Sequence, residues 1–158
     1  MRKYMIGLLF MTLVAGGRVA RADCETKFCQ QFKSILAARF NGFAEFRGKL
    51  QTRSEVSVHW ESTLTLPGAS FCLIKEFQSF TRFKCLFDVK GEDEAQYNKL
   101  VTDVQPALPA NWTRKKYSRA FFAQPTDSED DHVVAVSLNG STIIEITVDS
   151  PDSRQNRK

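Results

Sequence analysis

The stretch that decides the fold is FCLIKEFQSFTRFKC, residues 71–85. Apolar and polar residues alternate on both sides of a central Gln78-Ser79, which is the pattern of two short strands joined by a tight reversal. The strands are predicted at 71–77 and 80–89. Gln78-Ser79 is not one of the Asn-Gly or Asp-Gly pairs that favour a two-residue turn, so this prediction rests on the alternation.

The reversal determines which residues face each other across the hairpin. Cys72 falls opposite Cys85, and Ile74 falls opposite Phe83. Because alternate side chains of a strand point to the same face, all four lie on one apolar side of the sheet. A disulfide between Cys72 and Cys85 closes a loop of about 14 residues and stabilises the fold by about 3 kcal/mol in the chain-entropy model.

Residues 1–22 have the pattern of a secretory signal peptide. Arg2 and Lys3 form a positive start, an uncharged apolar run spans 5–15, and small residues at 20 and 22 suit a cleavage site. The apolar run is shorter than the roughly 20 residues that span a bilayer, so no stable membrane anchor is expected after cleavage. An uncleaved anchor is the alternative. The protein is predicted to be periplasmic or extracellular.

The basic excess of the chain lies in this first segment. The full chain has 22 Lys plus Arg, 18 Asp plus Glu and a formal net charge of +4. Residues 1–22 contain four of the basic residues and no acidic one, so the mature chain keeps 18 of each and has no net charge. Export and this neutrality argue against a nucleic-acid partner. A hydrophobic content of 42% and 13 Phe exclude a disordered chain.

All four cysteines follow the predicted signal peptide. An even number in an exported chain argues for two disulfides, so by elimination Cys24 pairs with Cys29. A separation of five does not suit two positions of one regular helix, and Cys24 is therefore expected in a non-helical lead-in. There is no Cys-x-x-Cys, and His59 and His132 complete no zinc spacing. We expect neither a metal nor a cofactor.

The rest of the chain predicts an α+β fold. The expected elements are a helix at 25–40, a strand at 55–66, a helix that starts at 91–94 and ends before Pro106, a long strand at 112–123, and strands at 132–138 and 142–148 around Asn139-Gly140. With the first hairpin, the order is α-β-β-β-α-β-β-β. The economical arrangement is a mostly antiparallel sheet with both helices on one face.

The predicted boundaries give one domain at 23–150 and a disordered tail at 151–158. The halves 23–90 and 91–150 share an order of elements that an ancient duplication would explain, although no residue-level repeat supports it.

His59 and Glu61 are the catalytic candidates. They lie two apart on the polar side of the strand predicted at 55–66, on the sheet face that the helices leave open. A carboxylate beside an imidazole can serve as an acid/base pair, but the pattern identifies no nucleophile and no oxyanion donors. The alternative is a solvated sheet face.

The binding candidates are Trp112 and three basic residues near it: Arg114, Lys116 and Arg119. Basic and aromatic residues together can bind a polysaccharide, a membrane headgroup or an acidic protein. The alternative is a charged edge strand that resists aggregation.

Arg39 has two interpretations as well. It falls near the middle of the apolar stripe of the first helix, where its stem can pack while its head reaches water. The alternative is an arginine that faces a ligand.

A resemblance to small exported bacterial proteins of unknown function is carried by four short runs: Phe46-Arg47-Gly48-Lys49, Leu66-Pro67-Gly68-Ala69-Ser70-Phe71-Cys72, Phe83-Lys84-Cys85 and Leu108-Pro109-Ala110-Asn111-Trp112. The order of elements is also similar to the helix–three-strand units of type III secretion chaperones and PepSY-like modules. That second similarity is topological and says little about function. Neither resemblance implies a catalytic residue.

These patterns together predict an exported binding protein with two disulfides. Its partner would be an unidentified protein or an envelope polymer that meets the open sheet face, and inhibition of a secreted enzyme is one form of this. The alternative function is a small secreted hydrolase that uses His59 and Glu61 as an acid/base pair.

Overall fold

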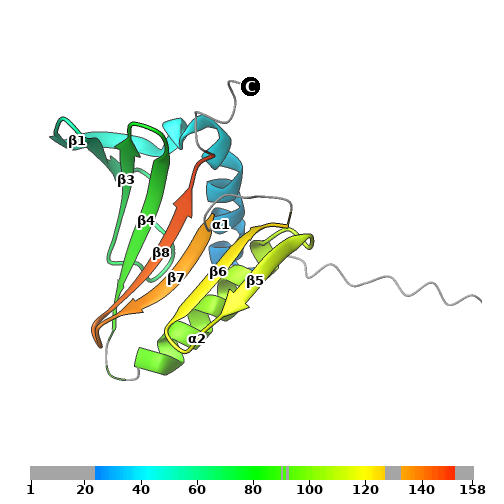
Figure 1. Ribbon diagram of the computed structural model, residues 1–158. Helices are drawn as coiled ribbons and strands as arrows, with labels where there is room; N and C mark the ends of the chain where they lie inside the picture. The colour runs from blue at the N-terminus through cyan, green and yellow to red at the C-terminus, as the bar shows by residue number, and fades with distance from the viewer. Residues whose placement is uncertain (1–23, 90, 92, 127–132, 152–158) are drawn as a thin grey trace, which may run out of the picture.

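The computed structural model describes residues 24–89, 91, 93–126 and 133–151 (Figure 1). The predicted signal peptide at 1–22, the acidic segment 127–132 and all but the first residue of the predicted tail lie outside the described residues. The elements follow in the order α1 (Lys27–Ala38), η1 (Arg39–Asn41), η2 (Ala44–Phe46), β1 (Arg47–Arg53), β2 (Ser57–Ser62), β3 (Phe71–Phe77), β4 (Thr81–Asp88), α2 (Asp93–Val104), η3 (Gln105–Ala107), β5 (Trp112–Lys116), β6 (Ala120–Pro125), β7 (Val134–Asn139) and β8 (Ile143–Asp149), where η marks a short 3₁₀ helix.

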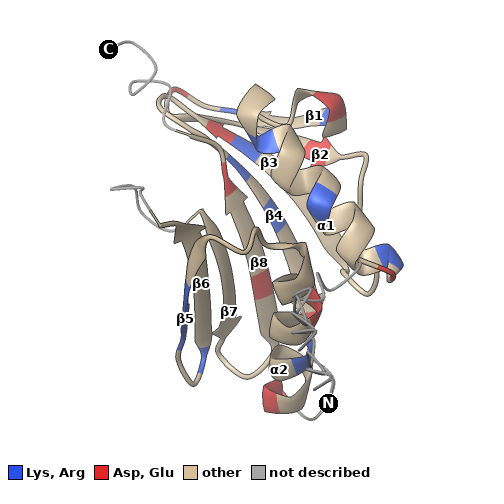
Figure 2. Cartoon of the chain, turned by 90° about the vertical axis from the view of Figure 1, so that its right-hand side faces the viewer, with Lys and Arg blue, Asp and Glu red and all other residues tan. Residues whose placement is uncertain are grey.

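The strands form one antiparallel, eight-stranded sheet in the order β1-β2-β3-β4-β8-β7-β6-β5. Each half of the chain contributes a helix followed by a four-stranded meander, and the two meanders join where β4 pairs with β8 (Figure 1). Both helices lie on the same side of this sheet (Figure 2). The predicted α+β class with a mostly antiparallel sheet is therefore confirmed.

The hairpin of β3 and β4 has the predicted register. Cys72 pairs with Cys85 and Ile74 pairs with Phe83, and all four side chains are buried in the core between sheet and helices. Cys72 and Cys85 form a disulfide. Alternation was sufficient here, because the central residues on one side of each strand are apolar.

The N-terminal helix α1 is two residues shorter at each end than predicted. Thr26 caps it, since its side-chain oxygen accepts a hydrogen bond from the Cys29 amide at 3.1 Å. Cys24 precedes this cap and is disulfide-bonded to Cys29, which confirms the second predicted disulfide and the non-helical lead-in. The chain leaves the helical end through Gly42, whose φ of 64° suits glycine.

The predicted number of strands was wrong by one in each half. Residues 47–53 form β1, although a turn ending at Gly48 was expected, and residues 112–125 form two strands, β5 and β6, where one long strand was expected. Strand β1 lies at an edge of the sheet and is largely exposed on both sides, so its residues carry no apolar alternation. Between β5 and β6 the chain reverses at residues 117–120, where the Tyr117 amide donates to the Ala120 carbonyl, without a glycine or proline to signal the turn.

The second half otherwise agrees with the sequence pattern. The apolar stripe of α2 is buried as predicted: Tyr97, Leu100, Val101 and Val104. Strands β7 and β8 form the expected hairpin, but Asn139 pairs with Ile143, so three residues separate the strands. Gly140 has a positive φ of 64° and Asn139 does not. The turn is therefore not the two-residue type I′ turn that Asn-Gly favours.

Candidate functional site

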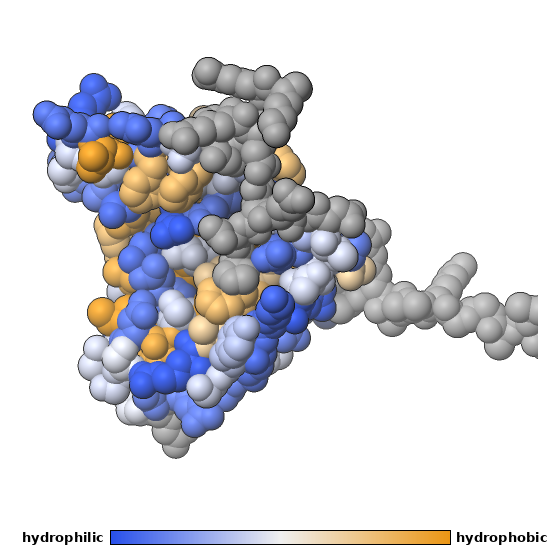
Figure 3. Space-filling model, viewed as in Figure 1, coloured by the Kyte–Doolittle hydropathy of each residue, from blue (hydrophilic) through white to orange (hydrophobic). Residues whose placement is uncertain are grey.

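The sheet face that points away from the helices, here called the open face, is built from two rows of side chains across the middle strands. One row runs Phe71, Leu86, Glu145, Ser137 and Ala120 from β3 to β6, and the next runs Leu73, Lys84, Thr147, Ala135 and Phe122. Their alternate neighbours are the buried residues that pack toward α1 and α2. The face in Figure 3 mixes apolar with hydrophilic residues.

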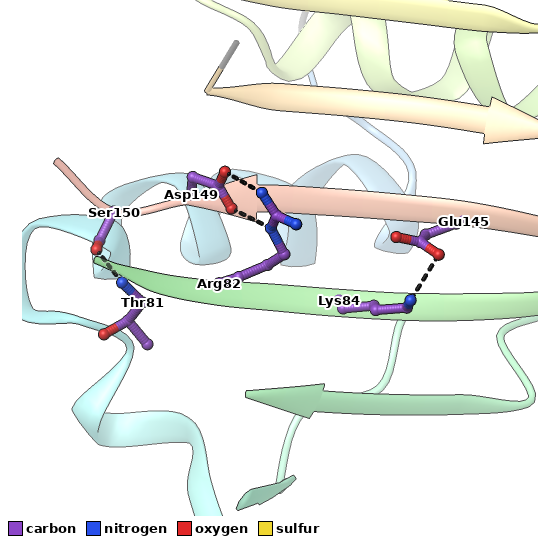
Figure 4. A network of polar contacts seen from close by, with 6 residues as sticks. All are labelled: Thr81, Arg82, Lys84, Glu145, Asp149 and Ser150. Carbon is purple, nitrogen blue, oxygen red and sulfur yellow. Dashed lines mark hydrogen bonds and ion pairs between the residues drawn. The ribbon is translucent and has the colours of Figure 1, made fainter. Parts of the chain in front are cut away.

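Two ion pairs cross the junction of the meanders on the open face (Figure 4). Arg82 donates two hydrogen bonds to Asp149, from Nε to Oδ1 at 2.6 Å and from Nη2 to Oδ2 at 2.7 Å. Lys84 Nζ lies 2.6 Å from Glu145 Oε2. The bonds to Asp149 raise the pKa of the Arg82 guanidinium against the opposing effect of burial. These charges are satisfied within the protein, so they form a polar border on the face and are poorly placed to attract a distant ion.

The open face carries three apolar side chains that are at least partly exposed to solvent. They are Phe71, Leu86 and Ile143, here called the apolar triplet. Phe71 pairs directly with Leu86 across β3 and β4. Ile143 lies on β8, two residues from the Glu145 that pairs with Leu86. Phe71 is 40% exposed and Ile143 is 36% exposed, while Leu86 is half-buried. The three positions are neighbours in the sheet, although the residues are 15 and 57 apart in the chain.

His59 and Glu61 lie on the same face, but each has a different partner. The His59 Nε2 atom is 3.1 Å from the Ser57 hydroxyl, and a Glu61 oxygen accepts a hydrogen bond from the Gln51 amide at 3.1 Å. Desolvation, with a smaller contribution from the positive charge of Lys75, lowers the pKa of His59. Sequence reasoning missed Ser57, although its position two residues before His59 on an alternating strand was the available signal.

The basic candidates near Trp112 are separated by the structure. The Arg114 guanidinium donates to the carbonyls of Leu108 and Pro109 at 3.4 and 3.3 Å. Lys116 donates to the side chain of Asn98 on α2 at 2.8 Å, and Arg119 donates to the Gly140 carbonyl. Each of these three cations is thus hydrogen-bonded to a different part of the protein itself. Since β5 is an edge strand, this arrangement is what a charged, aggregation-resistant edge requires.

Within the described ranges, no group of three His, Cys, Asp or Glu side chains is placed to hold a metal ion. Trp112 is half-buried and packs against the core. No helix in the described part of the chain is long and apolar enough to cross a membrane.

The two disulfides indicate a protein of an oxidising, non-cytoplasmic compartment. The similarity to small exported bacterial proteins, and to secretion-chaperone or PepSY-like units, stays a prediction. Comparison with protein-family models, with curated proteins and with solved structures finds no match to this chain.

Proposed function

We propose that the protein is an exported binding protein that docks a protein partner on its open face, in the periplasm or outside the cell. The observation that carries the proposal is the apolar triplet, a cluster of large apolar side chains on a sheet face that neither helix covers. Burying a large apolar side chain contributes about 1.5–3 kcal/mol. A partner that covers all three residues would gain a substantial part of its binding free energy there.

The charges around the triplet favour a protein over an envelope polymer. A polyanion needs several cations with no internal partner, whereas Arg82 and Lys84 are bonded to carboxylates of β8. Both signs of charge lie beside the triplet, which resembles the apolar centre and polar rim of protein interfaces. Inhibition of a secreted enzyme is one form that such docking can take.

Photo-crosslinking tests this proposal in the cells from which the protein comes. With benzoylphenylalanine in place of Phe71, we expect a discrete protein adduct that is absent when the probe replaces Lys33, an exposed residue of α1. Ile143→Asp should reduce the adduct at least tenfold. The substitution removes a central apolar contact worth about 2 kcal/mol or more and places a charge where the partner would cover it. The matched control is Thr102→Asp on the exposed side of α2, which should leave the adduct unchanged.

Three results would contradict the proposal. Equal adducts from positions 71 and 33 would mean that the open face is not selective. A diffuse adduct that is shortened by glycan hydrolases would replace the protein partner with an envelope polymer. An adduct of twice the chain mass, formed also by the purified protein, would identify self-association instead.

The Ser57–His59 contact favours one second candidate, a small secreted hydrolase. A hydroxyl 3.1 Å from an imidazole of lowered pKa has the geometry of a nucleophile and its base. The third member of such a site would orient the ring through Nδ1, and among the described residues no partner lies on that atom. Within the described part of the chain, His59 therefore lacks the support that a catalytic base usually has.

Labelling with a fluorophosphonate probe separates the two functions. If docking is the function, we expect Ser57 to react no faster than Ser54, which lies beside it. Rapid modification of Ser57 that is lost in His59→Gln would instead establish an activated serine and support the hydrolase.

A further inference from the structure

Arg39 is a buried cation at the C-terminal end of α1. Its side chain is 8% exposed, and the guanidinium carbon lies 4.3 Å from the ring centre of Phe40 and 5.3 Å from that of Trp112. No carboxylate among the described residues pairs with it, and no hydrogen bond from its side chain to them is formed. Packing against two aromatic rings compensates only part of the hydration that a buried guanidinium loses.

Three other partly buried cations contrast with Arg39. Arg47 pairs with Glu76 at 3.1 Å, and Arg82 and Lys84 pair with carboxylates of β8. Burial lowers the pKa of Arg39, and no carboxylate among the described residues opposes this effect. A buried charge is usually paired, so a pocket-lining cation without a carboxylate partner among the described residues points to a partner from outside.

Arg39 lines such a pocket. The pocket has a volume of about 280 Å³ and lies between η1, the turn from β3 to β4, and the residues after β8. Phe77 and Phe80 form part of its wall and stack at 4.6 Å between ring centres. Phe40 lines it too and is 72% exposed. The pocket thus combines an aromatic wall with one cation that no carboxylate of the described residues neutralises.

One acidic side chain lines the same pocket. Glu76 would repel an anion, but its carboxylate is bonded to Arg47. The remaining polar lining consists of neutral groups. Among them, the Ser150 amide donates a hydrogen bond to the Thr81 carbonyl, and the Ser150 hydroxyl accepts one from the Thr81 amide. The electrostatic character of the pocket is therefore set by Arg39.

We infer that this pocket binds an organic carboxylate, with Arg39 holding the carboxylate and the phenylalanines holding an apolar or aromatic body. A planar guanidinium matches a carboxylate through two parallel hydrogen bonds. The volume lies just below the range of about 300–1,000 Å³ for drug-sized ligands, so the bound group is the size of one aromatic acid. A free aromatic acid and the C-terminal phenylalanine of a polypeptide both have this chemistry. The inference is independent of the open face, since no member of the apolar triplet lines the pocket.

Nuclear magnetic resonance titration of the ¹⁵N-labelled protein tests the site. Phenylacetate and N-acetyl-phenylalanine should shift the Arg39 Nε–H and Trp112 indole signals along saturating curves. The chain has only two tryptophans, and the Trp60 indole signal should stay in place as an internal control. N-acetyl-phenylalanine amide, which lacks the carboxylate, should bind at least tenfold more weakly. A peptide acid ending in phenylalanine that binds tenfold tighter than phenylacetate would identify a polypeptide C-terminus as the source, and equal affinities would identify a free acid.

Variants of Arg39 complete the test. Arg39→Gln should weaken binding of N-acetyl-phenylalanine at least tenfold, whereas Arg53→Gln, which removes an exposed arginine of β1, should not. Arg39→Met keeps an apolar stem without the charge, and should raise the melting temperature of the free protein while abolishing binding. Equal binding of the acid and its amide to the unmodified protein would overturn the inference, and so would a lower melting temperature of Arg39→Met. Binding that appears only after the acidic residues within 127–132 are replaced by their amides would also overturn the inference. Arg39 would then have a carboxylate partner within the chain itself.

Discussion

Replacing Phe83 with alanine is expected to lower the free energy of unfolding by about 3–5 kcal/mol. Phe83 is 1% exposed and occupies the middle of β4, where it pairs with Ile74 on one side and Val148 on the other. Its ring centre lies 5.8 Å from that of Phe43 and 6.4 Å from that of Phe46. Truncation leaves a cavity among these rings at the junction of the two meanders, and close-packed neighbours can fill it only in part.

Urea denaturation followed by circular dichroism measures this effect. The matched control is Phe40→Ala, which removes the same kind of ring from an exposed position just after α1. It should change the free energy of unfolding by no more than about 1 kcal/mol, the value of its contact with Arg39. A loss below 1 kcal/mol for Phe83→Ala would mean that the ring does not hold the junction.

Removing the Cys72–Cys85 disulfide is expected to destabilise the protein by about 3 kcal/mol in the chain-entropy model. The bridge joins directly opposed residues of β3 and β4 at a sequence separation of 13. The Cys24–Cys29 bridge has a separation of only 5, so the double variant Cys24→Ala/Cys29→Ala should lose less, about 2 kcal/mol.

Denaturation of the oxidised proteins checks the order of these two effects. Dithiothreitol should bring the unmodified protein close to the stability of a variant that lacks both bridges. Peptide mapping without reduction should recover both pairs, and a Cys24–Cys72 link would contradict the structure. A larger loss for the short bridge would show that local strain or helix capping, and not loop closure, governs the stabilisation.

The predictable part of the fold consists of elements with one apolar side. The hairpin of β3 and β4 and the stripe of α2 were predicted because their periods of two and of 3.6 residues are visible locally. Strand β1 and the reversal between β5 and β6 were missed for the opposite reason. Their residues are held by pairing with β2 and β6, and their composition carries no period and no turn signal.

The candidate sites were predictable to a smaller extent. Alternation placed His59 and Glu61 on one face, but pairing with β1 gave the Glu61 carboxylate to Gln51, and the His59 imidazole contacts Ser57 of its own strand. The sequence marked Arg39 as a charge within an apolar stripe. That it lines a pocket depends on the turn after β3 and the residues after β8, which no local pattern connects to it.

By itself the sequence determined the α+β class, the hairpin register around Cys72 and Cys85, and both disulfides, because each depends on residues close together in the chain. Only the tertiary structure decided how the two meanders join. The bonds from Arg82 to Asp149 connect residues 67 apart, and the apolar triplet and the Arg39 pocket are likewise assembled from distant segments. Such contacts follow from the packing of whole elements against a common core, and they leave no trace in the alternation of neighbouring residues.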